Sequence, residues 1–154
     1  MKKCLLILLS LLLLLPLGCA DKQSAVEINF ADLAANPQNY NGKEIAITGY
    51  WFDGFEIAVL AEKLEETDFP AGNLRPAGIK IWMAGGLPED IGTKLYLQEN
   101  DITGYPAHYG KLKLSGTLEY GEGYGHLNSY AYRLTIYEAQ WLEWSPHPVS
   151  TTSR

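Results

Sequence analysis

Cysteine is nearly absent from this 154-residue chain, which contains only Cys4 and Cys19. Neither lies beyond position 19, so the long remainder has no thiol to join a disulfide, ligate zinc or act as a nucleophile. That remainder is long enough for one ordinary domain with a buried core, which needs no disulfide for stability. Small disulfide-rich folds and thiol enzymes are therefore excluded.

Basic residues are also scarce. The chain has 12 Lys and Arg against 18 Asp and Glu, a net charge of −6. Without Lys2 and Lys3, 10 basic residues remain against 18 acidic ones, a net charge of −8. Affinity for phosphate backbones comes mainly from Lys and Arg, and anionic lipid headgroups repel an acidic surface. The composition therefore argues against nucleic acid as a partner.

Only three histidines occur, His108, His126 and His147, and none stands at metal-ligand spacing from another. No Gly-x-Ser-x-Gly motif and no phosphate-binding loop is present. We predict no catalytic set, no metal site and no cofactor. His126 near Glu119 and Glu122, in an expected hairpin, leaves a weak metal or proton site open; the alternative is a histidine satisfied by backbone.

The stretch from Glu62 to Gly78 combines two prolines, two glycines and a run of charges, which predicts a long loop. Its acidic residues lack the alternating ligand and glycine pattern of a calcium loop. We interpret them as solvated surface charges rather than as a cation site.

The most informative stretch lies at the N-terminus. Two lysines precede an apolar run from Cys4 to Leu17, and Gly18-Cys19 follows, which is the layout of a secretory signal peptide. The run is too short for a membrane span of about 20 residues. With Leu15 before Gly18-Cys19, the segment resembles the bacterial lipoprotein signal, whose lipobox is roughly Leu-small-Gly-Cys.

This resemblance implies a signal peptide at residues 1–18, a lipid on Cys19 and a lipidated tether at residues 19–27. Ala20 stands where a retained lipoprotein would carry Asp, which implies the outer membrane, facing the periplasm, in a Gram-negative cell. In other cells the resemblance implies the outer face of the plasma membrane. The alternative is an ordinary signal peptide beside an unmodified cysteine.

Apolar periodicity predicts an all-β domain with one or two short helices. Five strands are expected, at residues 43–52, 55–61, 79–83, 111–120 and 130–143. Asp53-Gly54 predicts the first hairpin turn. Asn29 or Asp32 is expected to cap a short helix that ends at Ala35. The inward phase of the last strand shifts near Glu138, as it does at a β-bulge.

Five strands, with a helical segment after the third, predict a Greek-key small barrel of the OB type. The chain resembles OB-fold lipoproteins and uncharacterised envelope proteins between Leu33 and Gly49 and between Gly110 and Leu118. A β-sandwich or a lipocalin-like meander is the alternative. The OB-like domain is assigned to residues 28–144 and a disordered tail to residues 145–154.

Aromatic residues are plentiful, with 10 Tyr and 4 Trp, and the second half is dense in them. Exposed rings on an OB face stack bases or sugars, and tyrosine is enriched at interfaces. The alternative is that the rings fill the barrel and cover its ends. The candidate ligand-binding residues are Trp51, Tyr120, Tyr124, His126, Tyr130 and Tyr132.

These observations favour a non-catalytic binding module, anchored to the membrane through Cys19. Its ligand is expected to be an envelope protein, a glycan or a small molecule. A structural envelope component is the second hypothesis, and a small hydrolase using Glu and His is the third.

Overall fold

The computed structural model describes residues 24–68, 71–99 and 103–146. The expected signal peptide, the lipidated Cys19 and residues 147–154 of the expected tail lie outside the described residues. The described elements are β1 (Val26–Ile28), α1 (Phe30–Ala35), η1 (Pro37–Tyr40), β2 (Glu44–Gly54), β3 (Ile57–Asp68), β4 (Ala71–Ala84), α2 (Glu89–Gly92), β5 (Tyr96–Gln98), β6 (Ala107–Tyr124), η2 (His126–Asn128) and β7 (Tyr130–Trp141).

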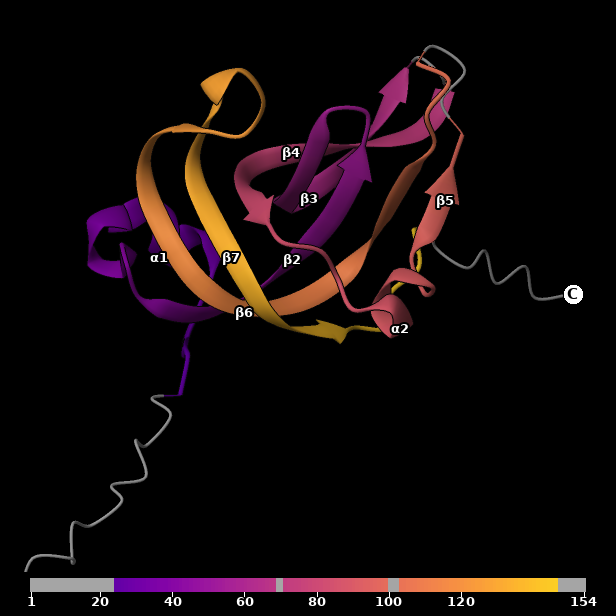
Figure 1. The fold of residues 1–154 in the computed structure, drawn as a ribbon. Helices are drawn as coiled ribbons and strands as arrows, with labels where there is room; N and C mark the ends of the chain where they lie inside the picture. The colour runs from indigo at the N-terminus through magenta and orange to yellow at the C-terminus, as the bar shows by residue number, and fades with distance from the viewer. Residues whose placement is uncertain (1–23, 69–70, 100–102, 147–154) are drawn as a thin grey trace, which may run out of the picture.

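The strands form one seven-stranded mixed sheet in the order β1-β2-β3-β4-β7-β6-β5 (Figure 1). An additional pairing joins β2 to β6, so β2, β3, β4, β7 and β6 are hydrogen-bonded in a closed ring. The β1–β2 and β4–β7 pairs are parallel. The expected β-rich architecture with short helices is confirmed. The expected count of five strands is too low, because β1 and β5 have three residues each, too few to carry an alternating pattern.

Helix α1 begins at the expected cap. The Asn29 side chain accepts a hydrogen bond from the Asp32 N–H at 2.8 Å, and the Asp32 carboxylate accepts one from the Asn29 N–H. These reciprocal bonds satisfy two backbone donors that a helix start leaves free. Phe30 and Leu33 are buried, so the helix is fixed to the first core cluster.

The first hairpin turn lies two residues later than expected. Gly54 pairs with Ile57, which leaves Phe55 and Glu56 as the turn. Glu56 has a φ of 57°, in the left-handed region that turns require. The predicted turn at Asp53-Gly54 is wrong, and Asp53 is a strand residue on the same face of β2 as Trp51.

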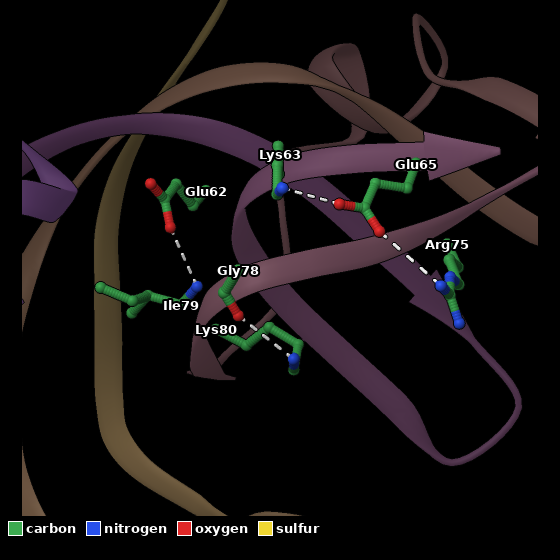
Figure 2. Close-up of polar contacts among 7 residues, drawn as sticks. All are labelled: Glu62, Lys63, Glu65, Arg75, Gly78, Ile79 and Lys80. Atoms are coloured by element: carbon green, nitrogen blue, oxygen red, sulfur yellow. Dashed lines mark hydrogen bonds and ion pairs between the residues drawn. The ribbon is translucent and has the colours of Figure 1, made fainter.

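The stretch expected to be a long loop, 62–78, is paired strand instead over its described residues, 62–68 and 71–78. β3 and β4 run alongside each other through it, with Glu65 opposite Arg75. Lys63 and Arg75 both contact the Glu65 carboxylate, at 2.7 and 3.7 Å (Figure 2). Pro76 is tolerated because only one edge of β4 is paired there. The charges that indicated a solvated loop are neighbours along and across the strands.

Gln98 of β5 forms hydrogen bonds with the other edge of this β4 segment. Its side-chain amide accepts a hydrogen bond from the Leu74 N–H at 2.9 Å and donates one to the Leu74 carbonyl at 2.8 Å. The Asn73 side chain also donates to the Glu99 carbonyl at 2.8 Å. The Gln98 amide thus satisfies the backbone of Leu74 as a neighbouring strand would.

A β-bulge interrupts β4 where Glu62 of β3 faces both Gly78 and Ile79. Gly78 has a φ of +71°, a conformation that favours glycine. The Glu62 carboxylate accepts a hydrogen bond from the Ile79 backbone N–H at 3.1 Å (Figure 2). It therefore satisfies a donor that the bulge removes from the ladder. A second bulge places one extra residue in β7 between Ile136 and Glu138, which confirms the expected phase shift.

The core lies against the inward faces of β2 and β6. Ile45, Ile47, Leu112 and Leu114 are fully buried there, and Trp51 is 4% exposed. Phe52, the next residue on the opposite face of β2, is also buried, within a second cluster formed by Phe52, Val59, Leu74, Ala107 and Tyr109. β2 is therefore covered on both sides at this point.

We expect Gly78→Ala to lower the free energy of unfolding by about 1–3 kcal/mol, the usual penalty for a non-glycine residue in a left-handed conformation. The new Cβ would also lie 2.5 Å from the Glu62 Oε2 atom and displace the carboxylate from Ile79. Urea unfolding followed by tryptophan fluorescence measures the difference.

Gly72→Ala is the matched control, because Gly72 has a φ of +82° but no atom within 4 Å of its Cβ position. It introduces the backbone strain without the contact with Glu62. Equal losses of stability for the two variants would contradict the role given to the Glu62 carboxylate.

Candidate functional site

Two cavities of the described chain contain predicted ligand-binding residues, whereas a third, of about 290 Å³ beside the ion pair of Lys113 with Glu27, contains none. The first, the hairpin site, is a cavity of about 470 Å³ at the β6–β7 hairpin. It is lined by Gly121, Glu122, Gly123, Asn128, Ser129, Tyr130 and Ala131. The second, the Trp51 cavity, has a volume of about 330 Å³. It is lined by Trp51, Asp53, Ala58, Gly85, Gly86, Leu87, Gly92, Leu95 and His108.

Four of the predicted ligand-binding tyrosines share the β6–β7 hairpin. Tyr120 lies opposite Tyr132, with ring centroids 5.2 Å apart, and Tyr124 lies opposite Tyr130. Tyr132 packs against the first core cluster. Burial raises the pKa of Tyr130 and Tyr132, so both phenols keep their protons at physiological pH and can donate hydrogen bonds.

A cation covers one of these rings. The Arg133 guanidinium lies 5.0 Å from the centroid of the Tyr124 ring, within cation–π range. Arg133 also forms an ion pair with Glu119. The hydrogen bond from Arg133 holds the pKa of the Glu119 carboxyl below its ordinary value. Tyr124 is therefore held by Arg133, which is itself oriented by a carboxylate.

The β6–β7 hairpin contacts two other parts of the ring. Tyr130 packs on Trp82 of β4, with centroids 5.2 Å apart. Gly125 has a φ of +67°, and a Cβ there would lie 2.5 Å from the Trp82 ring, so glycine is required for this approach. His126 lies 3.3 Å from the Glu56 carboxylate, across from the β2–β3 turn. The sequence indicated Glu119 and Glu122 as neighbours of His126, but the ion pair forms with Glu56.

Trp51 lies apart from these tyrosines, in the second cavity. Its side chain is 4% exposed, and its indole N–H has no hydrogen-bond partner among the described residues. A buried donor without a partner is uncommon in folded proteins. Most of the wall of the Trp51 cavity is formed by backbone and aliphatic side chains. The aliphatic residues are Ala58 from β3 and Leu87 and Leu95 from the segment around α2.

Two titratable groups face each other in the Trp51 cavity. Asp53 of β2 and His108 of β6 are directly opposite in the antiparallel ladder. Burial raises the pKa of the Asp53 carboxyl, and the charge of His108 acts in the opposite direction. Asp53 makes no hydrogen bond or ion pair with a described residue, so its carboxylate is available to a ligand.

Asp53, His108 and Trp82 were not among the site residues predicted from the sequence. The inward position of Asp53 could have been predicted, because Asp53 continues the two-residue period of Ile47 and Trp51 along β2. Its assignment to a turn concealed that phase. No local signal links Asp53 to His108, which lies more than fifty positions later.

The described residues supply little for catalysis or metal binding. Across residues 24–68, 71–99 and 103–146, no three His, Cys, Asp or Glu side chains are grouped closely enough to hold a metal ion. Neither cavity brings a serine or threonine hydroxyl against a histidine in the lining. His147 lies outside the described residues.

No helix in the described part of the chain is long and apolar enough to cross a bilayer. Comparisons with protein-family models, curated proteins and solved structures find no match for this chain. A functional conclusion therefore rests on the chemistry of the two cavities.

We expect Asp53→Asn to raise the free energy of unfolding at neutral pH by about 0.5–1 kcal/mol, within the range of single stabilising substitutions. Because burial raises the folded-state pKa of this carboxyl, its ionised form destabilises the folded state above that pKa. The gain should shrink as the pH falls and Asp53 becomes protonated. Urea unfolding between pH 4 and pH 8 tests this.

Glu66→Gln is the control, because it removes the same charge from an exposed position of β3. Its effect should stay within about 0.5 kcal/mol, as for most surface substitutions. A destabilised Asp53→Asn variant would mean that Asp53 has a structural partner.

Proposed function

We propose that this chain is a membrane-anchored bacterial envelope lipoprotein whose folded domain is a non-catalytic binding module. The lipobox-like segment that ends at Cys19 supports the anchor. β1 begins at Val26, so six residues separate it from Cys19, and they reach roughly 20 Å when extended. This tether would keep the domain close to the bilayer, on the periplasmic side of the outer membrane if the cell is Gram-negative.

The ring of strands is consistent with an OB plan, which we include in the proposal. An OB-fold is a five-stranded, partly open Greek-key barrel. The ring order β2-β3-β4-β7-β6 and the placement of α2 between β4 and β6 support this plan. OB ligands bind near the loop after the first strand and the loop before the last. Glu56 and His126 belong to the corresponding loops here, and their ion pair brings these loops together.

The observation that carries the binding function is the hairpin site, whose lining includes Tyr130 but none of the other three predicted tyrosines. Glu122, Asn128 and Ser129 contribute acceptors and donors to its lining, and Tyr130 adds a ring face and a hydroxyl. A flat ring beside several hydrogen-bonding groups is suited to a sugar, which has an apolar face and many hydroxyls. We therefore favour a neutral glycan over an anionic ligand, which the acidic chain would repel.

We expect the full-length chain, in detergent micelles, to bind a neutral oligosaccharide such as chitotetraose. Tyr130→Phe should weaken this binding by roughly 3- to 10-fold, the equivalent of one hydrogen bond. The variant retains the ring that packs on Trp82, so the fold should be unchanged. Isothermal titration calorimetry measures both affinities.

Leu127→Ala is the matched control in the same loop, because Leu127 is 81% exposed and does not line the cavity. Its affinity should match that of the unmodified chain. If a panel of neutral oligosaccharides shows no saturable binding, the glycan proposal fails. A stoichiometric envelope protein recovered with the chain would then favour the structural role.

The anchor has a separate test. We expect Cys19→Ser to move the protein from the membrane fraction to the soluble fraction, because that substitution removes the only thiol beyond the apolar run. Mass spectrometry of the unmodified chain should find a lipid-modified N-terminal Cys19. A mature form that starts elsewhere, with a free thiol, would contradict the lipoprotein assignment.

A further inference from the structure

The inward face of β2 is apolar along most of the strand and carries a carboxylate near its C-terminal end. Residues of one phase along this strand are apolar from Ile45 to Trp51, and the next position of that phase is the carboxylate of Asp53. A core position would normally carry an apolar side chain, and burial of a carboxylate is unfavourable unless a partner compensates for it. Asp53 makes no hydrogen bond or ion pair with a described residue, and the charge of His108 is what offsets the burial of its carboxylate.

The surroundings of Asp53 form a pocket rather than a surface. Trp51, Leu87 and Leu95 supply its apolar wall, and Gly85, Gly86 and Gly92 supply backbone without side chains. Ligand sites are typically apolar concavities with a few converging polar groups, and a perturbed titratable residue is a frequent marker. At about 330 Å³, the cavity is near the lower end of the range for such sites, which indicates a small molecule.

We propose that the Trp51 cavity binds a small primary ammonium ion on an apolar body, of the arylalkylamine class. The ammonium group would form an ion pair with the Asp53 carboxylate, beside the imidazole of His108. The aromatic body would pack against Trp51, Leu87 and Leu95. This site shares only strand β6 with the hairpin site, His108 lying near the start of that strand and Gly121 near its end, and it does not depend on the glycan proposal.

Other ligand classes fit the cavity less well. A carboxylate or phosphate would be repelled by Asp53. A neutral ligand of the same shape would leave the Asp53 carboxylate desolvated and unpaired, which is unfavourable. A metal ion needs more ligands than the one carboxylate and one imidazole in the lining. The net negative charge of the chain also attracts cations.

The proposal implies a pH dependence of binding. The titratable groups in the lining are Asp53 from β2 and His108 from β6, while Ala58 from β3 adds none. The segment around α2 lines the cavity only with glycine and leucine, and its titratable residues Glu89, Asp90 and Lys94 are not part of the lining. Burial raises the pKa of the Asp53 carboxyl, and its protonation would remove the ion pair. Affinity for the amine should therefore fall as the pH decreases.

Titration of the full-length chain in detergent micelles with 2-phenylethylamine tests the proposal by calorimetry. We expect saturable 1:1 binding at pH 7.5, at least tenfold weaker binding of 2-phenylethanol and none of phenylacetate. Asp53→Asn should weaken amine binding at least tenfold, whereas Glu66→Gln should leave it unchanged. Because Asp53→Asn is expected to fold more stably than the unmodified chain, unfolding cannot account for its loss of affinity.

A second variant tests the location of the site. A Cβ at Gly86 meets no atom within 4 Å, and the residue has no left-handed φ, so Gly86→Val places bulk in the cavity without a backbone clash. It should abolish amine binding, while Tyr130→Phe should leave it intact. Equal binding of the amine and the alcohol, or full binding by Asp53→Asn or Gly86→Val, would overturn the proposal.

Discussion

The structure depends on one close approach of backbone, at Gly49 of β2. One edge of β2 pairs with β6 along nearly its whole length, and the other edge pairs first with β1 and then, from Tyr50 onward, with β3. A Cβ at Gly49 would lie 2.8 Å from the Ala61 carbonyl oxygen and 2.9 Å from the side chains of Leu60 and Phe30. Only glycine allows β1, α1 and β3 to meet on β2 in this way, and the closed ring follows from that meeting.

The ring closure explains why both cavities exist where they do. Because β2 pairs with both β3 and β6, side chains from three strands converge on its inward face, and Trp51 and Asp53 at the end of that face share one wall with His108 and Ala58. The parallel β4–β7 pair closes the ring on the other side and brings Trp82 to the base of the β6–β7 hairpin. One topology therefore creates an apolar pocket with a carboxylate and, separately, a polar site that includes Tyr130.

The hairpin site is formed by residues close together in the sequence, whereas the Trp51 cavity is formed by residues far apart, and only the first could be predicted from a local pattern. Tyrosines at the hairpin follow each other closely along the chain, so composition alone drew attention to Tyr120, Tyr124, Tyr130 and Tyr132. The Trp51 cavity joins residues from β2, β3, β6 and the segment around α2. No short sequence pattern links these four segments. In addition, Asp53 followed by glycine has the composition of a turn. The β3–β4 pair was missed for a related reason, because its prolines, glycines and charges are typical of loops.

Local chemistry determined the features that need only near neighbours. The alternation of β6, the Asn29 cap of α1 and the bulge of β7 depend on residues within a few positions of one another, so the sequence by itself determined them. Tertiary structure decided which strands close the ring, where Glu62 finds the backbone N–H of Ile79, and that Asp53 faces His108. These contacts join distant residues, and their stability comes from burial and pairing that exist only after the chain has folded.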